Sequence, residues 1–295
     1  MRITFTKMEG CGNDYVYISG FTNAVPQEEK PALVRRFSDR HFGIGGDGVI
    51  FVNPSEKADF EMEMYNADGS RGEMCGNGIR CVARFVYEHG LTKNREIAIE
   101  SFGVVHHITL ESTAPDDFRV RVDMGAPILK AELVPADPAR FIGKGTAAEE
   151  DMLIAAPMEA AGRKWDVTCV SMGNPHAVVF VDDTASFPLE EIGPHFENHP
   201  AFPARINTEF VQVLSRDRVK MRVWERGSGE TLACGTGCCA TAAACVLNGR
   251  TQERVTVEVL GGELEIYWDR QQNIIWMTGP ASTVFEGEIE YVQGK

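Results

Sequence analysis

The sequence lacks several features that would assign it to a broad class of protein. It contains no apolar run of about 18 residues, so we expect no membrane-spanning helix. Its N-terminal segment carries Lys7 and Glu9 and lacks the apolar core of a secretory signal. It also lacks an excess of positive charge, because 29 Lys and Arg face 43 Asp and Glu, for a formal net charge of −14. We therefore expect a cytoplasmic protein that binds neither nucleic acid nor a membrane.

The cysteines lack the spacing of a metal site. There are eight, and they are Cys11, Cys75, Cys81, Cys169, Cys234, Cys238, Cys239 and Cys245. No two form a Cys-x-x-Cys pair, and none combines with His in a zinc-finger or ribbon pattern. Because nothing indicates secretion, a disulfide framework is not expected either. Each cysteine should therefore be a buried small hydrophobe or a reactive thiol.

Cofactor motifs are missing as well. Gly43-Ile44-Gly45-Gly46-Asp47-Gly48 matches the glycine pattern of dinucleotide-binding proteins. However, a predicted helix precedes it and the predicted strand Val49–Val52 follows, whereas that fingerprint requires a strand first and a helix afterwards. There is no P-loop Gly-Lys-[Ser/Thr] and no positive sign of pyridoxal phosphate. We expect a tight loop at this segment and a protein without a cofactor.

What the sequence does contain is a series of short β-rich segments with few helices. Its 295 residues, 43% of them hydrophobic, predict two domains with a core each. Apolar and β-branched patterns predict strands at Ile3–Thr6, Tyr15–Ile18, Val49–Val52, Phe60–Tyr65, Glu96–Ser101, Val104–Leu110, Phe118–Met124, Val178–Val181, Val211–Val213, Val219–Glu225, Val255–Val259, Glu263–Trp268 and Ile274–Met277. Helices are predicted at Pro31–Phe37, Gly78–His89, Pro188–Phe196 and Thr236–Leu247. Ala131–Ala161 is expected to be irregular or one short helix.

Two of the predicted helices begin with the same motif. Cys75-Gly76-Asn77-Gly78 opens one, and Cys234-Gly235-Thr236-Gly237 opens the other, 159 residues later. The pairs that align at this or a nearby offset are Gly48 with Asn207, Asn66 with Glu225, and Gly12-Asn13 with Gly173-Asn174. Both helices are apolar over most of their surface, so each should lie inside a wrapping of strands. The repeat predicts two similar domains, related by a pseudo-twofold axis, with a cleft between them.

The shared motif suits acid-base chemistry. A cysteine at a helix N-terminus meets unpaired backbone N–H groups and the positive end of the helix dipole. Such sites lower a thiol pKa from about 8.5 to roughly 3.5–7.5, and the same N–H groups suit a carboxylate. If two such sites face each other, one thiolate removes a proton from a carbon and the opposite thiol returns one to its other face. This predicts that Cys75 and Cys234 act as a pair.

Other residues carry weaker signals. Core packing is expected for Cys81, Cys169, Cys238, Cys239 and Cys245. Cys11 lies in a Gly-rich loop without a repeat partner and stays unassigned. His176 follows a turn that repeats the Asn13 loop, so it has either a site role or a packing role. Glu225-Arg226 precedes Cys234 and either lines the cleft or forms a surface ion pair.

These motifs resemble the diaminopimelate epimerase family. The matching segments run from near the N-terminus to about residue 250, and they are Lys7-Met8-Glu9-Gly10-Cys11-Gly12-Asn13-Asp14, Gly43-Ile44-Gly45-Gly46-Asp47-Gly48, Tyr65-Asn66-Ala67-Asp68-Gly69-Ser70, Glu73-Met74-Cys75-Gly76-Asn77-Gly78-Ile79-Arg80-Cys81, Ser171-Met172-Gly173-Asn174-Pro175-His176 and Glu225-Arg226-Gly227-Ser228-Gly229-Glu230-Thr231-Leu232-Ala233-Cys234-Gly235-Thr236-Gly237. The resemblance implies two similar α/β (α+β) domains, each a β-barrel-like mixed sheet around a central helix. We place them at residues 1–124, with 280–295 returning to the first domain, and 125–279.

The resemblance also implies a function. It predicts a cofactor-independent, homodimeric enzyme that interconverts LL- and meso-2,6-diaminoheptanedioate in lysine and peptidoglycan-precursor synthesis. Cys75 and Cys234 would be the two bases, supported by His176 and Glu225. The residues expected to hold the substrate, at its reacting carboxylate or its other amino-acid end, are Asn13, Asn66, Gly76, Asn77, Asn174, Asn207, Glu225, Arg226, Gly235 and Thr236.

The sequence departs from the family pattern at two positions. Some members carry Gln where this chain has Gly48, so one side-chain contact is expected to be missing or replaced by water. Many members carry Cys where this chain has Ala177, which should matter little. Two other functions remain open. A proline racemase or hydroxyproline epimerase usually has His at the position of Asn77, and a thiol switch would join Cys75 and Cys234 in a disulfide.

Overall fold

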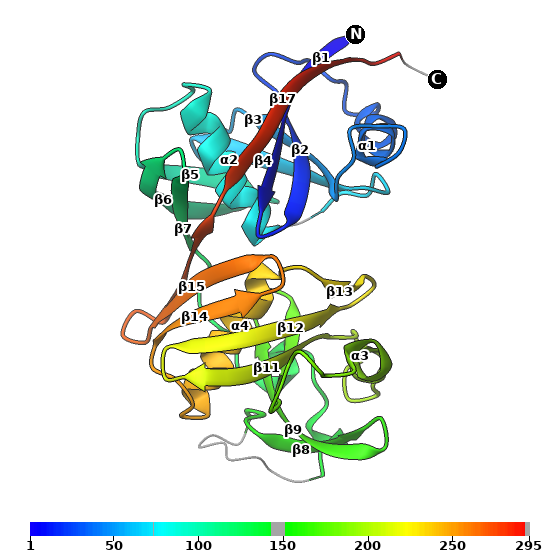
Figure 1. Ribbon diagram of the computed structural model, residues 1–295, viewed down its shortest axis with the longest axis vertical. Helices are drawn as coiled ribbons and strands as arrows, with labels where there is room; N and C mark the ends of the chain where they lie inside the picture. Colours follow the sequence, from blue (N-terminus) through cyan, green and yellow to red (C-terminus); the bar gives the residue numbers. More distant parts are fainter. Residues whose placement is uncertain (73, 143–150, 293–295) are drawn as a thin grey trace. The chain divides into compact units, whose positions relative to one another are not determined.

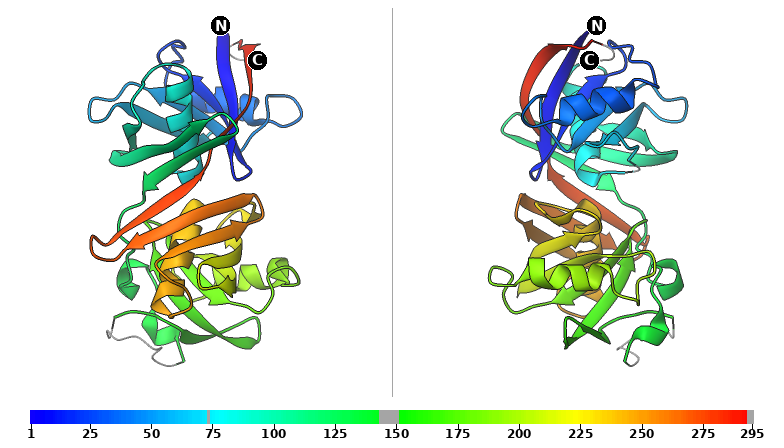
Figure 2. Two further views of the ribbon diagram at one scale, coloured as in Figure 1. Left: turned by 60° about the vertical axis from the view of Figure 1, so that its left-hand side comes forward. Right: turned by 90° about the vertical axis from the view of Figure 1, so that its right-hand side faces the viewer.

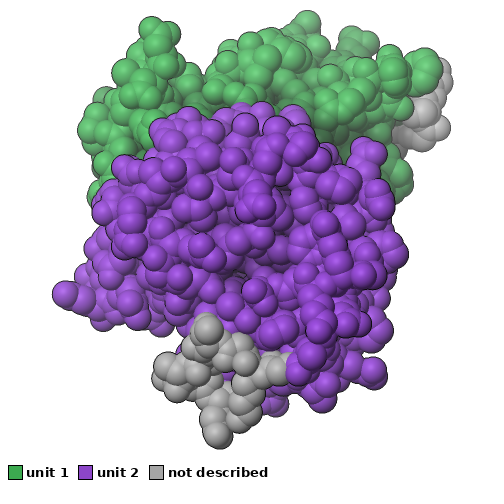
Figure 3. All heavy atoms as spheres, turned by 60° about the horizontal axis from the view of Figure 1, so that its bottom comes forward, with its two compact units in different colours: residues 1–122, 278–295 green, residues 123–277 purple. Residues whose placement is uncertain are grey.

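The computed structural model describes residues 1–72, 74–142 and 151–292. The chain divides into two compact units, Met1–Val122 with Thr278–Lys295 and Asp123–Met277 (Figure 3). Glu73 of the family motif and residues 143–150 of the Ala131–Ala161 segment lie outside the described residues. Among the described residues, no helix is both long and apolar enough to cross a bilayer.

The first unit is a mixed sheet around one helix (Figures 1 and 2). Its strands are β1 (Arg2–Gly10), β2 (Asn13–Ser19), β3 (Gly48–Asn53), β4 (Phe60–Asn66), β5 (Glu96–Ser101), β6 (Val104–Ala114), β7 (Asp117–Asp123) and β17 (Ser282–Glu290). Its helices are α1 (Lys30–Ser38) and α2 (Gly76–Glu88). β2 pairs with β3, and β4 with β5, in parallel. These parallel pairs need crossovers, which α1 and α2 supply.

The helix α2 is the centre of this unit. Residues 76–86 are buried, which leaves only its C-terminal end at the surface. The helix packs against β1, β2, β5 and β6, so strands surround it as its apolar sequence predicts. α1 lies on the outer side and buries Leu33, Val34 and Phe37 in a second core with Val16 and Val49.

The second unit repeats this arrangement. Its strands are β8 (Ala156–Ala160), β9 (Arg163–Ser171), β10 (Pro175–Phe180), β11 (Asn207–Ser215), β12 (Arg218–Glu225), β13 (Gly229–Thr231), β14 (Arg254–Val259), β15 (Gly262–Asp269) and β16 (Ile274–Pro280). Its helices are α3 (Leu189–Glu197), α4 (Gly235–Leu247) and the short 3-10 helices η1 (Ala131–Leu133) and η2 (Pro138–Arg140). β10 pairs with β11, and β12 with β14, in parallel across α3 and α4.

The helix α4 is built from small residues because it is enclosed by sheet. It packs against β9, β10, β11, β14 and β15. Cys238, Cys239 and Cys245 have no exposed surface, and the alanines between them are equally buried. Small side chains let the strands approach the helix backbone closely, so these cysteines pack as small hydrophobes, as predicted.

The predicted strands and helices are all present, and the fold class is confirmed as a sheet-dominated mixture of strands with few helices. Four strands were missed: β8, β9, β13 and β17. β17 pairs antiparallel with β1, from Arg2 opposite Glu290 to Glu9 opposite Ser282. Most residues of this strand are exposed, so its sequence has no clear alternation of apolar and charged side chains. A strand without that alternation is hard to predict from sequence. The expectation for 131–161 was wrong at Ala156–Ala160, where pairing with β9 overrides a composition of low β propensity.

Candidate active site

Cys75 is the N-cap residue of α2. Its backbone is extended, with φ −129° and ψ 111°, and its Sγ accepts a hydrogen bond from the backbone N–H of Gly78 at 3.2 Å. This N–H is one of the groups that a helix start leaves without a backbone acceptor. The residue is half-buried. A hydrogen bond donated to the sulfur favours negative charge on it.

Cys234 caps α4 in almost the same geometry. Its backbone has φ −124° and ψ 110°, and the N–H of Gly237 donates to Sγ at 3.4 Å. The hydroxyl of Thr236 lies 3.5 Å from the sulfur. Because both caps share their dihedral angles and their i to i+3 bond, the repeated motif produces a repeated structure.

The surroundings of the two sulfurs differ. Burial raises the pKa of Cys234 well above its usual value, and the negative charges of Glu225 and Glu209 raise it further. The bonds from Thr236 and Gly237 act in the opposite direction but do not outweigh burial. The expectation that the helix start lowers the thiol pKa is therefore wrong at Cys234, because desolvation and like charge dominate there.

Cys75 contacts the side-chain amide of Asn13. Its thiol donates to Oδ1 of Asn13 at 3.0 Å. The Nδ2 of Asn13 donates in turn to Oδ2 of Asp47 at 2.6 Å. Asn13 thus lies beside the thiol, and both ends of its amide bind protein atoms. The sequence assigns Asp47 only to a glycine-rich loop. The structure places it in the turn before β3, in contact with Asn13.

His176 lies in a buried polar cluster. Its Nδ1 is 2.7 Å from Oε1 of Glu209, and both side chains have no exposed surface. Its Nε2 is 3.0 Å from Oδ1 of Asn174. Glu209 was missed from the sequence, yet it is two residues beyond Asn207 on the same strand and therefore on the same face. That spacing is the signal that could have identified it.

The carboxyl group of Glu225 is close to Cys234. It accepts a hydrogen bond from the hydroxyl of Thr231, and burial raises its pKa. Arg226 does not pair with it, since the Arg226 guanidinium donates to the carbonyl of Ala204 at 3.1 Å. Glu225 and Arg226 therefore form no ion pair among the described contacts. The interpretation of these two residues as a surface ion pair is wrong.

The remaining predicted residues occupy strand ends and helix starts. Asn207 is buried, donates to the carbonyl of Pro175 and accepts from the backbone N–H of Arg226. Asn66 is exposed at the end of β4, where its Nδ2 donates to Ser70. Asn77, in the first turn of α2, is buried, and its Oδ1 has no hydrogen-bond partner within the described ranges.

Gly48 has no room for a side chain. A Cβ there would lie 2.0 Å from the carbonyl oxygen of Tyr65 and 2.9 Å from the ring of Tyr15. Protein atoms fill the space that a side chain at position 48 would occupy. That space is therefore not simply a cavity for water. The repeat partner Asn207 accommodates its side chain in the second unit.

The other cysteines are packed away from solvent. Burial raises the pKa of Cys81, Cys169 and Cys245 to about 12 in each case. Cys11 sits in the β1–β2 turn with φ +54°, and a bond from Arg80 reaches its sulfur at 3.8 Å. The cysteines, all within the described part of the chain, form no disulfide. No group of three or more possible metal ligands occurs among the described residues.

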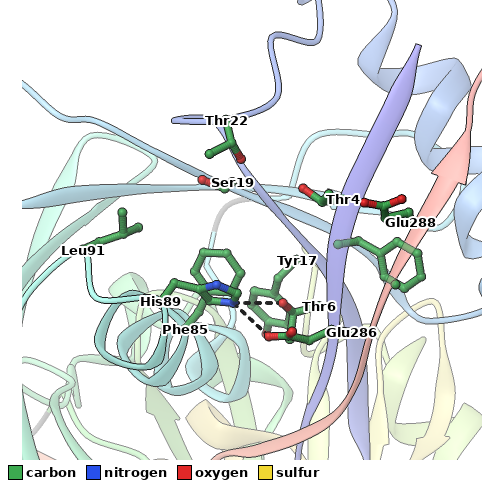
Figure 4. A pocket seen from close by; sticks show the side chains of 12 residues that line it. Thr4, Thr6, Tyr17, Ser19, Thr22, Phe85, His89, Leu91, Glu286 and Glu288 are labelled. Carbon is green, nitrogen blue, oxygen red and sulfur yellow. Dashed lines mark hydrogen bonds and ion pairs between the residues drawn. The ribbon is translucent and has the colours of Figure 1, made fainter.

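A separate pocket lies in the first unit between the sheet and the end of α2 (Figure 4). Its volume is about 440 Å³, and its walls come from β1, β2, β17 and the C-terminal part of α2. The ring of His89 is tilted by 37° against that of Phe85, with 4.1 Å between the ring centroids. Its Nε2 lies 3.1 Å from Thr6 Oγ1 and 3.5 Å from Glu286 Oε1. None of the predicted site residues lines it.

Comparisons with known proteins agree on one family. A sequence model of the family described as diaminopimelate epimerase matches residues 5–130 and 168–284. A protein named diaminopimelate epimerase from Agathobacter rectalis is 54% identical over 290 residues, which cover 98% of this chain and 99% of that protein. Another so named, from Acetivibrio thermocellus, is 50% identical over 288 residues, with 97% and 98% covered.

Solved structures share the fold at low identity. A phenazine biosynthesis protein of the PhzF family from Bacillus anthracis has a TM-score of 0.70 and 16% identity, covering 99% of this chain and all of its own. A hydroxyproline epimerase from Agrobacterium vitis has a TM-score of 0.65 and 14% identity, with 98% and 91% covered. At these identities the likeness establishes the fold alone.

Proposed function

The chain belongs to the diaminopimelate epimerase family, and from that premise we propose that it interconverts LL- and meso-2,6-diaminoheptanedioate without a cofactor. The observation that carries the proposal is the pair of matched N-cap cysteines, Cys75 and Cys234. An enzyme that only removes a proton needs one base. Inversion of a carbon needs a proton acceptor on one side and a donor on the other, which explains why the motif is duplicated.

The proposed reaction exchanges one proton for another. One cysteine, as the thiolate, takes the proton from the α-carbon, and the C–H electron pair remains as a carbanion next to the carboxylate. The other cysteine, as the thiol, donates its proton to the opposite face of the same carbon. The two sulfurs finish in exchanged protonation states. The reaction therefore consumes nothing and runs in either direction.

The helix starts would hold the reacting carboxylate. The backbone N–H groups around Gly76-Asn77 and Gly235-Thr236 belong to the unpaired groups of the first helical turns. They favour the charge that spreads onto the carboxylate oxygens as the proton leaves. We assign them the reacting end of the substrate.

The second amino-acid end would be held by side chains. We assign the grip on the substrate, mostly at this second end, to Asn13, Asn66, Asn174, Asn207 and Arg226. Supporting roles go to His176 and Glu225. His176 belongs to the buried cluster with Glu209 and Asn174, and Glu225 adds a carboxyl group near the sulfur of Cys234.

Isotope exchange tests this proposal. LL-Diaminopimelate is incubated with the protein in deuterated water without added cofactor, and both deuterium at the α-carbon and the meso isomer are measured. We expect both to appear together. Absence of both would contradict the proposal. Proline is assayed in parallel, and turnover of proline alone would assign a proline racemase instead.

We further propose a homodimer with lysine and peptidoglycan-precursor synthesis as its pathway. Sedimentation of the intact protein measures the first point, with twice the 32.5 kDa chain mass expected. A monomer at every concentration tested would contradict it. The pathway is tested in a strain that lacks its own epimerase. This gene should restore growth of that strain, and its Cys75→Ala variant should not. No restoration by the unaltered gene would count against the pathway.

A further inference from the structure

The amide of Asn13 joins a carboxylate to a thiol. Its Nδ2 lies 2.6 Å from Oδ2 of Asp47, and its Oδ1 lies 3.0 Å from Sγ of Cys75. The three residues come from the start of β2, the loop before β3 and the start of α2. This line of contacts therefore depends on the packed unit and not on a local motif.

The carboxylate decides which way the amide faces. A carboxylate oxygen only accepts hydrogen bonds, so the NH₂ group of Asn13 must face Asp47 and the carbonyl must face the sulfur. Asp47 is itself fixed, because Arg40 pairs with its Oδ1 at 2.9 Å and the backbone N–H of Asp14 donates to its Oδ2 at 3.1 Å. The opposite orientation of the amide would place two acceptors together.

We propose that Asp47 is a positioning residue that holds Asn13 so that its carbonyl oxygen accepts the thiol proton of Cys75. An acceptor at the sulfur stabilises the thiol, whereas the N–H of Gly78, 3.2 Å away, stabilises the thiolate. The described contacts of Cys75 thus include one that favours each protonation state. The inference rests on the proposed function, which requires this sulfur to alternate between the two states.

Among the described residues of this unit, the titratable groups that interact with Cys75 include Tyr15 and Tyr17 of β2 and Cys81 of α2. Burial raises the pKa of Tyr15, and the charges of Cys75 and Asp47 add to the shift. Burial likewise raises the pKa of Tyr17, and that of Cys81 to about 12. All three stay protonated near neutral pH. Tyr15, which also hydrogen-bonds with Cys75, therefore acts on this sulfur as a neutral hydroxyl and not as a charge.

The variant Asp47→Asn tests this role. Once the carboxylate is lost, the Asn13 amide can turn and donate its NH₂ group to the sulfur. The rate at which iodoacetamide alkylates Cys75 is measured across pH by peptide mass spectrometry. We expect the half-maximal pH to fall by about one unit, which gives about tenfold more thiolate at neutral pH. Asp116→Asn, in an exposed turn of the same unit, is the matched control and should not move it.

A second background separates positioning from charge. Asp47→Asn also removes a negative charge, which by itself favours the thiolate. In Asn13→Ala protein the amide is absent, so only this direct effect of charge remains. There we expect Asp47→Asn to shift the half-maximal pH of Cys75 alkylation by only a small fraction of its shift in the unaltered background. An equal shift in both backgrounds means that Asp47 acts by charge alone. That result, or no shift at all, overturns the proposal.

A measurement on the unaltered protein covers the case of a variant that does not fold. By NMR, the side-chain NH₂ protons of Asn13 should be strongly inequivalent and protected from exchange, because the carboxylate binds one of them. Fast exchange of both protons contradicts the inference. Alkylation needs no turnover, so the two proposals fail separately: a protein without epimerase activity can still show the shift, and an active one can lack it.

Discussion

The two cysteine sites begin alike and differ in what surrounds the sulfur. Cys75 and Cys234 have the same cap geometry, within 5° in φ and 1° in ψ. The first sulfur binds the amide of Asn13, whereas the second is buried near the carboxyl groups of Glu225 and Glu209. A repeated motif thus reproduces the backbone without reproducing the electrostatics.

This difference shows that one backbone geometry can place a sulfur in two electrostatic environments. The contacts that set the cap are local, from Cys to the N–H three residues later. The contacts that set the charge on the sulfur come from other strands and loops. In a reaction where one sulfur is a thiolate while the other is a thiol, unequal surroundings allow unequal resting states. Substitutions at the two sites test whether they are equal in function despite their unequal surroundings.

The largest effect is expected from removing either sulfur. Cys75→Ala and Cys234→Ala should each lower epimerisation by about 10²- to 10⁴-fold, because each removes one of the two proposed proton-transfer groups. Turnover of LL-diaminopimelate is the measurement. Cys169→Ala, a buried cysteine of the second unit, is the control and should retain turnover. If either N-cap variant stays fully active, the two-base mechanism is wrong.

The next effect concerns the glycine three residues after each cysteine. At Gly237 a Cβ would lie 2.6 Å from Oε1 of Glu209, which is fixed by its bond to His176. At Gly78 it would lie 2.8 Å from the end of the flexible Ile50 side chain. We expect Gly237→Ala to lower the free energy of unfolding by about 1–3 kcal/mol and Gly78→Ala by much less. Urea unfolding of both variants decides this, and equal losses would show that the two helix starts are packed alike.

The smallest effect is a change in pH dependence at the second site. The negative charge of Glu225 disfavours the thiolate and so raises the pKa of Cys234. In Glu225→Gln the pKa should therefore fall, and alkylation of Cys234 should begin at lower pH, by about one unit or less. Cys75 should be unaffected in the same sample. Glu159→Gln, an exposed carboxylate of β8, is the control, and a shift of Cys234 in that variant would point to long-range charge instead.

Most of the architecture could be predicted from the sequence, because apolar periodicity and helix starts are local. The exceptions are informative. β17 is mostly exposed, so its pattern is weak, and β8 forms only because β9 offers it a partner. At the candidate site, Glu209 was missed although its spacing from Asn207 was visible, since a single glutamate in an apolar strand does not reveal its own burial.

The start of each central helix and its cysteine cap follow from the local sequence, since capping involves residues three apart. What each sulfur contacts depends on the packing of distant segments. Asn13 reaches Cys75 from 62 positions away in the chain, and Asp47 reaches Asn13 from 34 positions away. Burial together with Glu209 and Glu225 raises the pKa of Cys234. The physical reason is that desolvation and charge depend on everything packed around an atom, whereas a helix start depends on its neighbours in the chain.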